Sequence, residues 1–281
     1  MLRPAHWLKN FFVLAPLFFA DIFNYSTNIT AFSGFICFSL LSSAIYIFND
    51  WRDIEADRNH KKKKLRPLAS GEVSPKGAFF ILILLLVFLS LIVYISNFRM
   101  VSISFLSIYL IVNLSYSLGL KQIPVIELML VSSGFVLRLI FGASIIEVEM
   151  SIWILVCTGL LSTLIVVGKR RADLVQENDK NFARRSLNGY SLEYLNHLLV
   201  IFSACVITSY LLFCASSYAT EKFGVDVLWT SIFVIVGVLL FLKSLIVDKS
   251  GDDPVKLFVS SGSLQLVTVS WVFSFILVIN F

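Results

Sequence analysis

The sequence has few of the side chains from which metal and redox centres are usually built. Its 281 residues include four cysteines and three histidines, without a CxxC pair or a histidine cluster. The cysteines, Cys37, Cys157, Cys205 and Cys214, all fall in apolar segments, so we expect them to be structural core residues. The sequence also has no Walker loop, no nucleotide-binding GxGxxG motif and no low-complexity tract. These absences argue against a zinc site, a thiol redox site and the common nucleotide-binding folds.

Charged residues are also scarce. They make up 15% of the chain and hydrophobic residues 58%, and the mean hydropathy is +0.86. Because apolar runs of about 20 residues, the length that crosses a bilayer, recur along the chain, we predict an all-α polytopic membrane protein, a single domain over residues 1–281. About nine transmembrane helices are expected, at residues 11–24, 30–48, 77–96, 100–118, 124–146, 150–168, 193–216, 225–247 and 258–280. The first contains Pro16 and Asp21, so we expect it to be tilted or partly interfacial.

Lys and Arg are distributed unequally between the predicted loops. With the N-terminus on the cytoplasmic side, all but three of the 23 basic residues fall in cytoplasmic segments, which is the positive-inside pattern. The exceptions are Arg99 and Lys222 in outer loops and Arg138 within a span. We expect a multi-pass protein of the cell inner (plasma) membrane, with its N-terminus and active site cytoplasmic. The net charge of +5 reflects this topology, so it requires no nucleic-acid partner.

Three aspartates, Asp50, Asp53 and Asp57, follow the second predicted span. Their spacing of i, i+3 and i+7 places them on one face of a helix. Such carboxylates repel unless a cation lies between them, so removing one charge should cost no stability. Mg2+ prefers hard oxygen ligands and combines one or two carboxylates with water and substrate phosphates, so the cluster is typical of a magnesium-diphosphate site. The alternative is a solvated loop in which Arg52 and Arg58 neutralise the acids.

A second polar segment, residues 168–179, follows the sixth predicted span on the same side. If the helix continues through it, Lys169, Asp173 and Glu177 are successive i, i+4 neighbours, close to Arg170. Two acidic clusters flanked by Lys and Arg are what a metal-bridged pyrophosphate needs. The alternative is a positive-inside anchor with incidental acids.

The fifth predicted span contains two charges, Glu127 near its cytoplasmic end and Arg138 near its middle. Eleven residues return to the same helix face, about 16 Å further along the axis. Because an intramembrane charge usually faces a cavity or a partner, Arg138 is a candidate functional residue, with a buried structural ion pair as the alternative. Just before this span, Tyr116 supplies a hydroxyl and Lys121 a cation at the same membrane face.

The N-terminal segment carries Arg3, Lys9 and Asn10 around Trp7. This composition fits an ordinary interfacial anchor. It equally fits a set of side chains that converge on an anionic ligand.

Together these residues resemble the UbiA superfamily of intramembrane prenyltransferases. The first signature of that superfamily, NDxxDxxxD followed by RP and Gly, is matched by Asn49, Asp50, Asp53, Asp57, Arg66, Pro67 and Gly71. The motifs of its decaprenyl-phosphate phosphoribosyltransferase branch are matched by Arg3, Pro4, Trp7, Lys9 and Asn10, by the run from Pro124 to Arg138, and by Gly168, Lys169, Arg170, Asp173 and Leu174. That branch often has Glu where this chain has Asp173. Aromatic prenyltransferases usually have DxxxD where this chain has Asp173 and Glu177.

The resemblance implies a Mg2+-dependent transfer of 5-phosphoribose from phosphoribosyl pyrophosphate to a polyprenyl phosphate, with release of pyrophosphate. It implies that Asp50, Asp53 and Asp57 hold the metal, and that Asp173 binds a second metal or the ribose hydroxyls. The substrate-binding candidates are Lys9, Asn49, Arg66, Tyr116, Lys121, Arg138, Lys169, Arg170 and Glu177. Among them, Lys9, Lys169 and Arg170 would bind phosphate oxygens, and Arg138 or Lys121 would receive the lipid phosphate.

Two other functions remain open at this point. Within the same fold, the protein could move a prenyl group from a prenyl diphosphate to an aromatic or other small acceptor. A carrier or lipid flippase, from another class, would also have intramembrane charges, but it would not need both acidic clusters. Asp252 and Asp253, before the last span, are assigned no role, and no oligomeric state is predicted.

Overall fold

The computed structural model describes residues 1–20, 24–59, 63–177, 189–247 and 254–280. Every regular element in these ranges is a helix, as predicted. The chain divides into two compact units, which are described separately. Unit 1 comprises Met1–Lys121 and Gly134–Met150, and unit 2 comprises Gln122–Ser133 and Ser151–Phe281. The single domain expected from the sequence stays a prediction.

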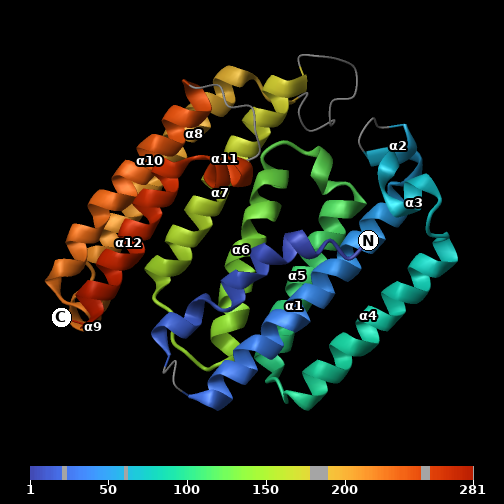
Figure 1. Ribbon diagram of the computed structural model, residues 1–281, viewed down its shortest axis with the longest axis horizontal. Helices are drawn as coiled ribbons and strands as arrows, with labels where there is room; N and C mark the ends of the chain where they lie inside the picture. The colour runs from blue at the N-terminus through green and yellow to red at the C-terminus, as the bar shows by residue number, and fades with distance from the viewer. Residues whose placement is uncertain (21–23, 60–62, 178–188, 248–253, 281) are drawn as a thin grey trace. The chain divides into compact units, whose positions relative to one another are not determined.

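Unit 1 is built around the long helix α1. Its elements are η1 (Pro4–Val13), η2 (Ala15–Phe19), α1 (Tyr25–Arg52), α2 (Ile54–Arg58), η3 (Lys63–Leu65), α3 (Pro67–Ser70), α4 (Pro75–Ile95), α5 (Met100–Leu118) and η4 (Leu120–Gln122). Helix α6 (Ile126–Ile145) begins in unit 2 and ends in unit 1. Helix α1 packs against η1, α4 and α5, so its end meets several other segments of the unit (Figure 1).

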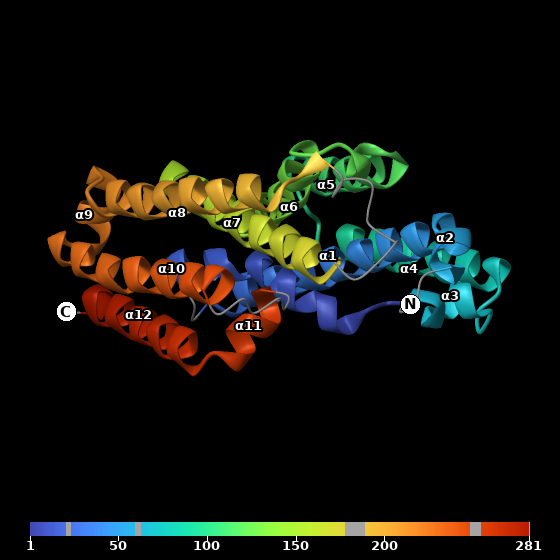
Figure 2. The ribbon, with the colours of Figure 1, turned by 90° about the horizontal axis from the view of Figure 1, so that it is seen from above.

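Unit 2 is a group of long helices with short helices at their ends. Its elements are α7 (Ile152–Glu177), α8 (Leu192–Cys214), α9 (Ser217–Phe223), η6 (Val225–Thr230), α10 (Ser231–Ile246), α11 (Pro254–Ser260) and α12 (Gly262–Asn280). Helix α8 packs against α7 and α10, and α10 packs against α12 (Figures 1 and 2). Helix α7 continues beyond residue 168, so the second polar segment starts as a helix, as its predicted spacing requires.

Seven of the described helices are long and apolar enough to cross a membrane, so the protein is a multi-pass membrane protein. They are Tyr25–Arg52, Pro75–Ile95, Met100–Leu118, Ile126–Ile145, Ile152–Val175, Leu192–Cys214 and Val225–Ile246. Gly262–Val278 is a shorter apolar helix, so the expected count of nine is approximate. The first expected span, residues 11–24, contains the end of η1 and all of η2 instead of one long α-helix. Pro16 has no backbone N–H to donate, which disfavours a continuous helix there.

The N-terminal segment is packed into the core of unit 1. Val13 and Phe141 are almost fully buried. A Cβ on Gly142 of α6 would lie 2.1 Å from the backbone oxygen of Val13, so glycine is needed for this close approach. Trp7 Nε1 donates a hydrogen bond to Ser43 Oγ of α1 (3.0 Å). The segment that carries Arg3 is therefore fixed against α1.

Unit 2 has an apolar core and two buried cations, Arg170 and Arg171. Leu164, Leu195 and Leu245 are almost fully buried in it. Arg171 of α7 donates to Asn196 Oδ1 (2.7 Å) and to the backbone oxygen of Leu245 (2.6 Å), so it joins α7 to α8 and to the end of α10.

The cysteines are free thiols, and two of them match the prediction of core residues. Cys37 and Cys214 are buried, and Cys157 is half-buried. Cys205 is exposed on α8, so the prediction is wrong for this residue. An apolar side chain on the outer face of a membrane helix contacts lipid, so a hydrophobic sequence context alone does not distinguish a core residue from a lipid-facing one.

Candidate active site

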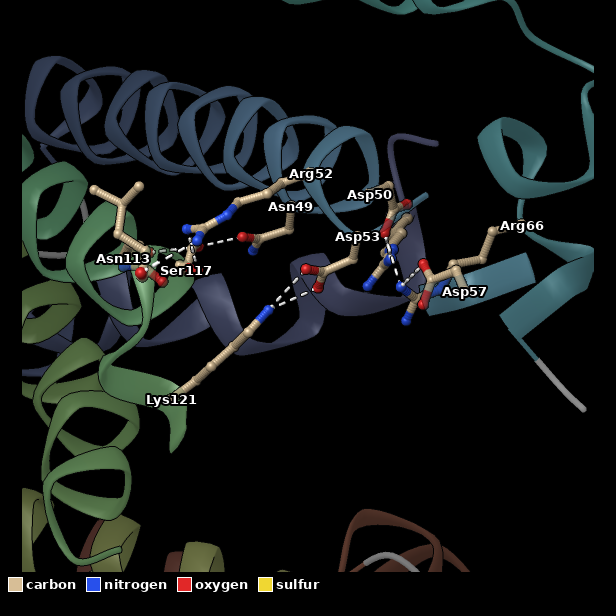
Figure 3. Close-up of polar contacts among 11 residues, drawn as sticks. Asn49, Asp50, Arg52, Asp53, Asp57, Arg66, Asn113, Ser117 and Lys121 are labelled. Atoms are coloured by element: carbon tan, nitrogen blue, oxygen red, sulfur yellow. Dashed lines mark hydrogen bonds and ion pairs between the residues drawn. The ribbon is translucent and has the colours of Figure 1, made fainter. Parts of the chain in front are cut away.

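The first acidic cluster lies where α1 ends. The helix stops one residue before Asp53, which joins it to the short α2. Their spacing predicts that Asp50, Asp53 and Asp57 share one continuous helix face. This prediction is wrong, because the helix is interrupted at Asp53. Asp50 and Asp57 are buried and both face Arg66, whereas Asp53 faces Lys121 (Figure 3).

Asp50 and Asp57 share one cation. Arg66 Nη1 lies 2.7 Å from Asp57 Oδ2 and 3.0 Å from Asp50 Oδ1. Arg3 Nη2 also contacts Asp50 Oδ1. Arginine suits this position because its planar, permanently charged guanidinium presents several donors at once. Arg66 was a predicted substrate-binding residue, and the structure places it among the aspartates.

Lys121 neutralises the third carboxylate, with Nζ 2.9 Å from Asp53 Oδ1 and 2.7 Å from Oδ2. The expectation of uncompensated repulsion among the aspartates is therefore wrong. A charge-paired loop exists, but its cations differ from those predicted. Arg58 Nε donates to the backbone oxygen of Ala69 (3.3 Å), and Arg52 donates to carbonyls at the end of α5.

A metal site is not preformed here. In the described ranges, no group of three or more His, Cys, Asp or Glu side chains is arranged to hold a metal ion. Figure 3 shows the reason, because Arg66 lies between Asp50 and Asp57 and Lys121 lies against Asp53. The donor set nevertheless fits Mg2+, since all three side chains offer hard carboxylate oxygens and two of them already share a cation.

Asn49, a predicted substrate-binding residue, lies at the contact between α1 and α5, and Tyr116, another, lies in the last turn of α5. Ser117 Oγ donates to the backbone oxygen of Asn113 (2.7 Å) and also contacts Asn49 Oδ1. Ser117 is buried, and Tyr116 is half-buried in the last turn of α5. Asn49 therefore connects the end of α1 to the end of α5.

Arg138 is buried in unit 1 among neutral groups. Its Nε donates to Asn10 Oδ1 (2.8 Å), Nη1 to the backbone oxygen of Gly134 (2.7 Å), and Nη2 to the Tyr109 hydroxyl (2.8 Å). Its guanidinium carbon lies 4.9 Å from the centroid of the Tyr109 ring, a stabilising cation–π geometry. Within the described residues no carboxylate accepts a hydrogen bond from Arg138, so the alternative of a buried structural ion pair is wrong. These contacts favour a structural role for Arg138.

One interpretation of the N-terminal segment has Asn10 bind an anionic ligand, but its side chain bonds protein groups. It is fully buried, and its Nδ2 donates to Ser39 Oγ (3.0 Å) and Ser42 Oγ (3.2 Å) of α1. With its Oδ1 accepting from Arg138, Asn10 joins η1, α1 and α6. Lys9, the neighbouring candidate, is half-buried on η1.

The second cluster, in unit 2, is built around Arg170. Its Nε and Nη2 donate to the two carboxylate oxygens of Glu127 (2.6 and 2.7 Å), and its Nη1 donates to Asp173 Oδ2 (2.9 Å). Glu127 is fully buried in the first turn of α6, where the helix dipole favours a negative charge. Asp173 is 35% exposed. Arg170 therefore binds two carboxylates, although the sequence predicted a phosphate ligand for it.

The remaining candidates of this cluster lie on the same helix. Lys169 is half-buried on α7. Glu177 is the last residue of α7, and its side chain lies outside the described part of the structure. Asp252 and Asp253 also lie outside the described residues.

A tyrosine fixes the turn that precedes Glu127. The backbone N–H of Val125 donates to the Tyr190 hydroxyl (2.6 Å). Val125 has a φ of +66°, which is unfavourable for a β-branched residue. Burial raises the pKa of the Tyr190 phenol above its usual range, so the hydroxyl stays protonated at neutral pH.

Two residues of these clusters were not predicted as site residues. Arg3 belongs to the N-terminal motif, and that motif was the available signal for its role. The sequence identifies Glu127 only as a second charge on the helix face of Arg138, about 16 Å away, and predicts no partner for it. Its actual partner, Arg170, is on another helix, 43 residues away in the sequence.

The fold is known from solved structures. A UbiA homolog from Archaeoglobus fulgidus, bound to DMAPP and Mg2+, aligns with 100% of this chain and 98% of its own, with a TM-score of 0.74 and 18% sequence identity. This likeness defines the fold class as that of a polytopic, all-helical UbiA-type membrane protein.

Sequence comparisons agree with the fold. The model of the UbiA prenyltransferase family matches residues 10–272. A decaprenyl-phosphate phosphoribosyltransferase from Corynebacterium glutamicum is 33% identical over 99% of this chain and 85% of its own length. One from Mycobacterium tuberculosis is 31% identical over 96% of this chain and 90% of its own. The chain therefore belongs to the UbiA prenyltransferase family of membrane-embedded transferases.

Proposed function

We propose that this protein transfers 5-phosphoribose from phosphoribosyl pyrophosphate to a polyprenyl phosphate and releases pyrophosphate. The observation that carries the proposal is the cluster of three aspartates and three cations at the end of α1. Such a cluster suits a leaving pyrophosphate, which needs several positive charges around its oxygens. The choice of donor and acceptor is supported by the names of the relatives from C. glutamicum and M. tuberculosis.

The proposed reaction requires charge neutralisation and no general base. An oxygen of the lipid phosphate attacks C1 of the ribose, the bond from C1 to the pyrophosphate oxygen breaks, and its electron pair leaves with pyrophosphate. The attacking phosphate is already an anion, so no proton has to be removed from it. The barrier therefore depends mainly on how well the site stabilises the departing negative charge.

The first cluster supplies this stabilisation in the proposal. Arg3, Arg66 and Lys121 donate charge-assisted hydrogen bonds to pyrophosphate oxygens. Lys121 is proposed for this role, and no longer for the lipid phosphate, because it pairs with Asp53 of the cluster. Asp50, Asp53 and Asp57 would hold Mg2+, which when bound supplies Lewis-acid stabilisation of the leaving group. In the structure the same cations neutralise the carboxylates.

The second cluster gives Asp173 a defined position. One of its oxygens accepts a hydrogen bond from Arg170, and the side chain is partly exposed. We propose that Asp173 binds the ribose hydroxyls or a second metal, and that Arg170, held by Glu127, orients it. Lys169 stays a candidate for binding substrate phosphates.

The burial and hydrogen bonds of the remaining candidates decide whether they are proposed as substrate ligands. Lys9 and Tyr116, both half-buried in unit 1, stay candidates for binding substrate phosphates. Arg138 is not proposed as the lipid-phosphate site, because its three nitrogens donate to protein groups. The loop distribution of Lys and Arg supports an active site on the cytoplasmic face of the inner membrane.

Prenyl transfer from a prenyl diphosphate is the second candidate, because the A. fulgidus homolog binds DMAPP and Mg2+. The two functions differ in the donor that releases pyrophosphate, which can be measured with purified protein in detergent with Mg2+. We expect release with phosphoribosyl pyrophosphate that requires polyprenyl phosphate, and its loss in Asp57→Asn. Release from a prenyl diphosphate and an aromatic acceptor, without turnover of phosphoribosyl pyrophosphate, would favour prenyl transfer. An absence of release from every donor would favour a carrier.

A further inference from the structure

Arg52 lies inside the acidic motif, directly before Asp53, yet its side chain contacts another helix. Its Nη2 donates to the backbone oxygen of Leu118 (3.2 Å), and its Nη1 donates to that of Ser117. Figure 3 shows the guanidinium of Arg52 beside Ser117, while Lys121 extends toward Asp53. Arg52 therefore joins the end of α1 to the end of α5.

The end of α5 needs such a donor. The last four backbone oxygens of an α-helix have no intrahelical partner, and the helix dipole favours a cation beside them. Helix α5 ends at Leu118, and Gly119 follows with a φ of +150°, a conformation that other residues rarely adopt. Gly119 thus permits the direction in which the chain leaves α5. Arg52 holds the end of α5 against α1, so it fixes that direction relative to α1.

Lys121 follows this anchored end by three residues. Its Nζ contacts both carboxylate oxygens of Asp53, the next residue after Arg52. Of these two adjacent residues, Arg52 therefore bonds the end of α5, and Asp53 accepts hydrogen bonds from Lys121. We propose that Arg52 is a positioning residue that places Lys121 at the pyrophosphate site by bonding the last carbonyls of α5. This inference depends on the proposed function, in which Lys121 binds pyrophosphate.

Two simpler roles for Arg52 predict different behaviour. A cation that only adds positive charge to the acidic motif would be replaced fully by lysine. A helix cap that only stabilises α5 would change the unfolding transition and leave donor affinity unchanged. Positioning predicts a loss of donor affinity that depends on the presence of Lys121.

The test is a double-mutant cycle on the affinity for phosphoribosyl pyrophosphate with Mg2+, measured by calorimetry in detergent. We expect Arg52→Ala to weaken binding about 3- to 10-fold, which corresponds to roughly 0.7–1.4 kcal/mol of coupling. In a Lys121→Ala background, the same change should weaken it less than about 2-fold. Arg52→Lys should recover only part of the loss, because an ammonium lacks the planar fork of a guanidinium.

The matched control is Arg99→Ala. Arg99 is the arginine at the other end of α5, and its ion pair with Glu147 (3.0 Å) is exposed. This variant should bind the donor as the wild-type protein does. An equal loss from Arg52→Ala with and without Lys121, or full recovery in Arg52→Lys, would overturn the proposal.

Hydrogen exchange of the ligand-free protein gives an independent measurement. Arg52→Ala should speed amide exchange at residues 119–122, and Arg99→Ala should not. Unchanged exchange in Arg52→Ala overturns the positioning role. If the wild-type protein does not bind phosphoribosyl pyrophosphate, the proposed function fails, and the exchange result still shows whether Arg52 holds the segment that carries Lys121.

Discussion

Replacing Asp57 by Asn should destabilise the ligand-free protein more than replacing Asp53 by Asn. The Asp57 side chain is 4% exposed and lies 2.7 Å from Arg66, whereas Asp53 and Lys121 are 32% and 24% exposed. A hydrogen bond to a charged group contributes about 1.5–3 kcal/mol, and we expect Asp57→Asn to lose most of it. A more exposed ion pair contributes about 0–1 kcal/mol, which bounds the loss in Asp53→Asn.

Equilibrium unfolding in mixed micelles with increasing SDS measures both losses, and the five tryptophans supply the fluorescence signal. Glu147→Gln, which removes one charge of an ion pair whose side chains are 67% and 63% exposed, is the matched control and should change the midpoint least. Equal midpoints for Asp57→Asn and the wild-type protein would refute the reasoning. The cations would then not hold the carboxylates in place, and the three carboxylates would repel one another without stabilising ion pairs.

Three further predictions concern the second cluster and the topology. Glu127→Gln should lower the free energy of unfolding by up to about 3–5 kcal/mol, because it leaves Arg170 buried without its main counter-charge. An unfolding midpoint equal to that of the wild-type protein in the same SDS titration would contradict this. Asp173→Asn should weaken binding of phosphoribosyl pyrophosphate. It should change the free energy of unfolding by less than about 1 kcal/mol, since Asp173 is partly exposed. Unchanged affinity by calorimetry would exclude Asp173 from the donor site. On a background without the native cysteines, a cysteine at Lys222 should react with an impermeant thiol reagent from outside intact cells, and one at Glu72 should not; labelling at Glu72 would contradict the orientation.

The sequence predicted the class of fold well because membrane insertion is a local property. A run of apolar residues long enough to cross the bilayer must form a helix, whatever its neighbours are. The first expected span was the exception. Pro16 interrupts it, and the close approach permitted by Gly142 places the segment against α6 inside unit 1, which hydropathy does not describe.

The sequence was less informative about which charges pair. Asp50, Asp53 and Asp57 were recognised from their spacing, but their counter-charges come from residues up to 68 positions away. Arg52 and Arg58 were the nearest cations in the sequence, yet both donate to backbone carbonyls.

Arg138 illustrates the same limit of sequence reasoning. Glu127 shares its helix face, but the Arg138 side chain bonds Asn10, 128 residues earlier in the chain. Helical periodicity predicts which residues share a face. It does not predict which other segment covers that face.

The most direct test of the central claim follows the 5-phosphate of the donor. Purified protein in detergent is given phosphoribosyl pyrophosphate labelled at its 5-phosphate, together with Mg2+ and polyprenyl phosphate, and the label is partitioned between organic and aqueous phases. The account predicts that the label enters the organic phase only when polyprenyl phosphate is present, and that Asp57→Asn abolishes this transfer. If the label stays in the aqueous phase while the same protein forms a prenylated product from a prenyl diphosphate, phosphoribosyl transfer is contradicted.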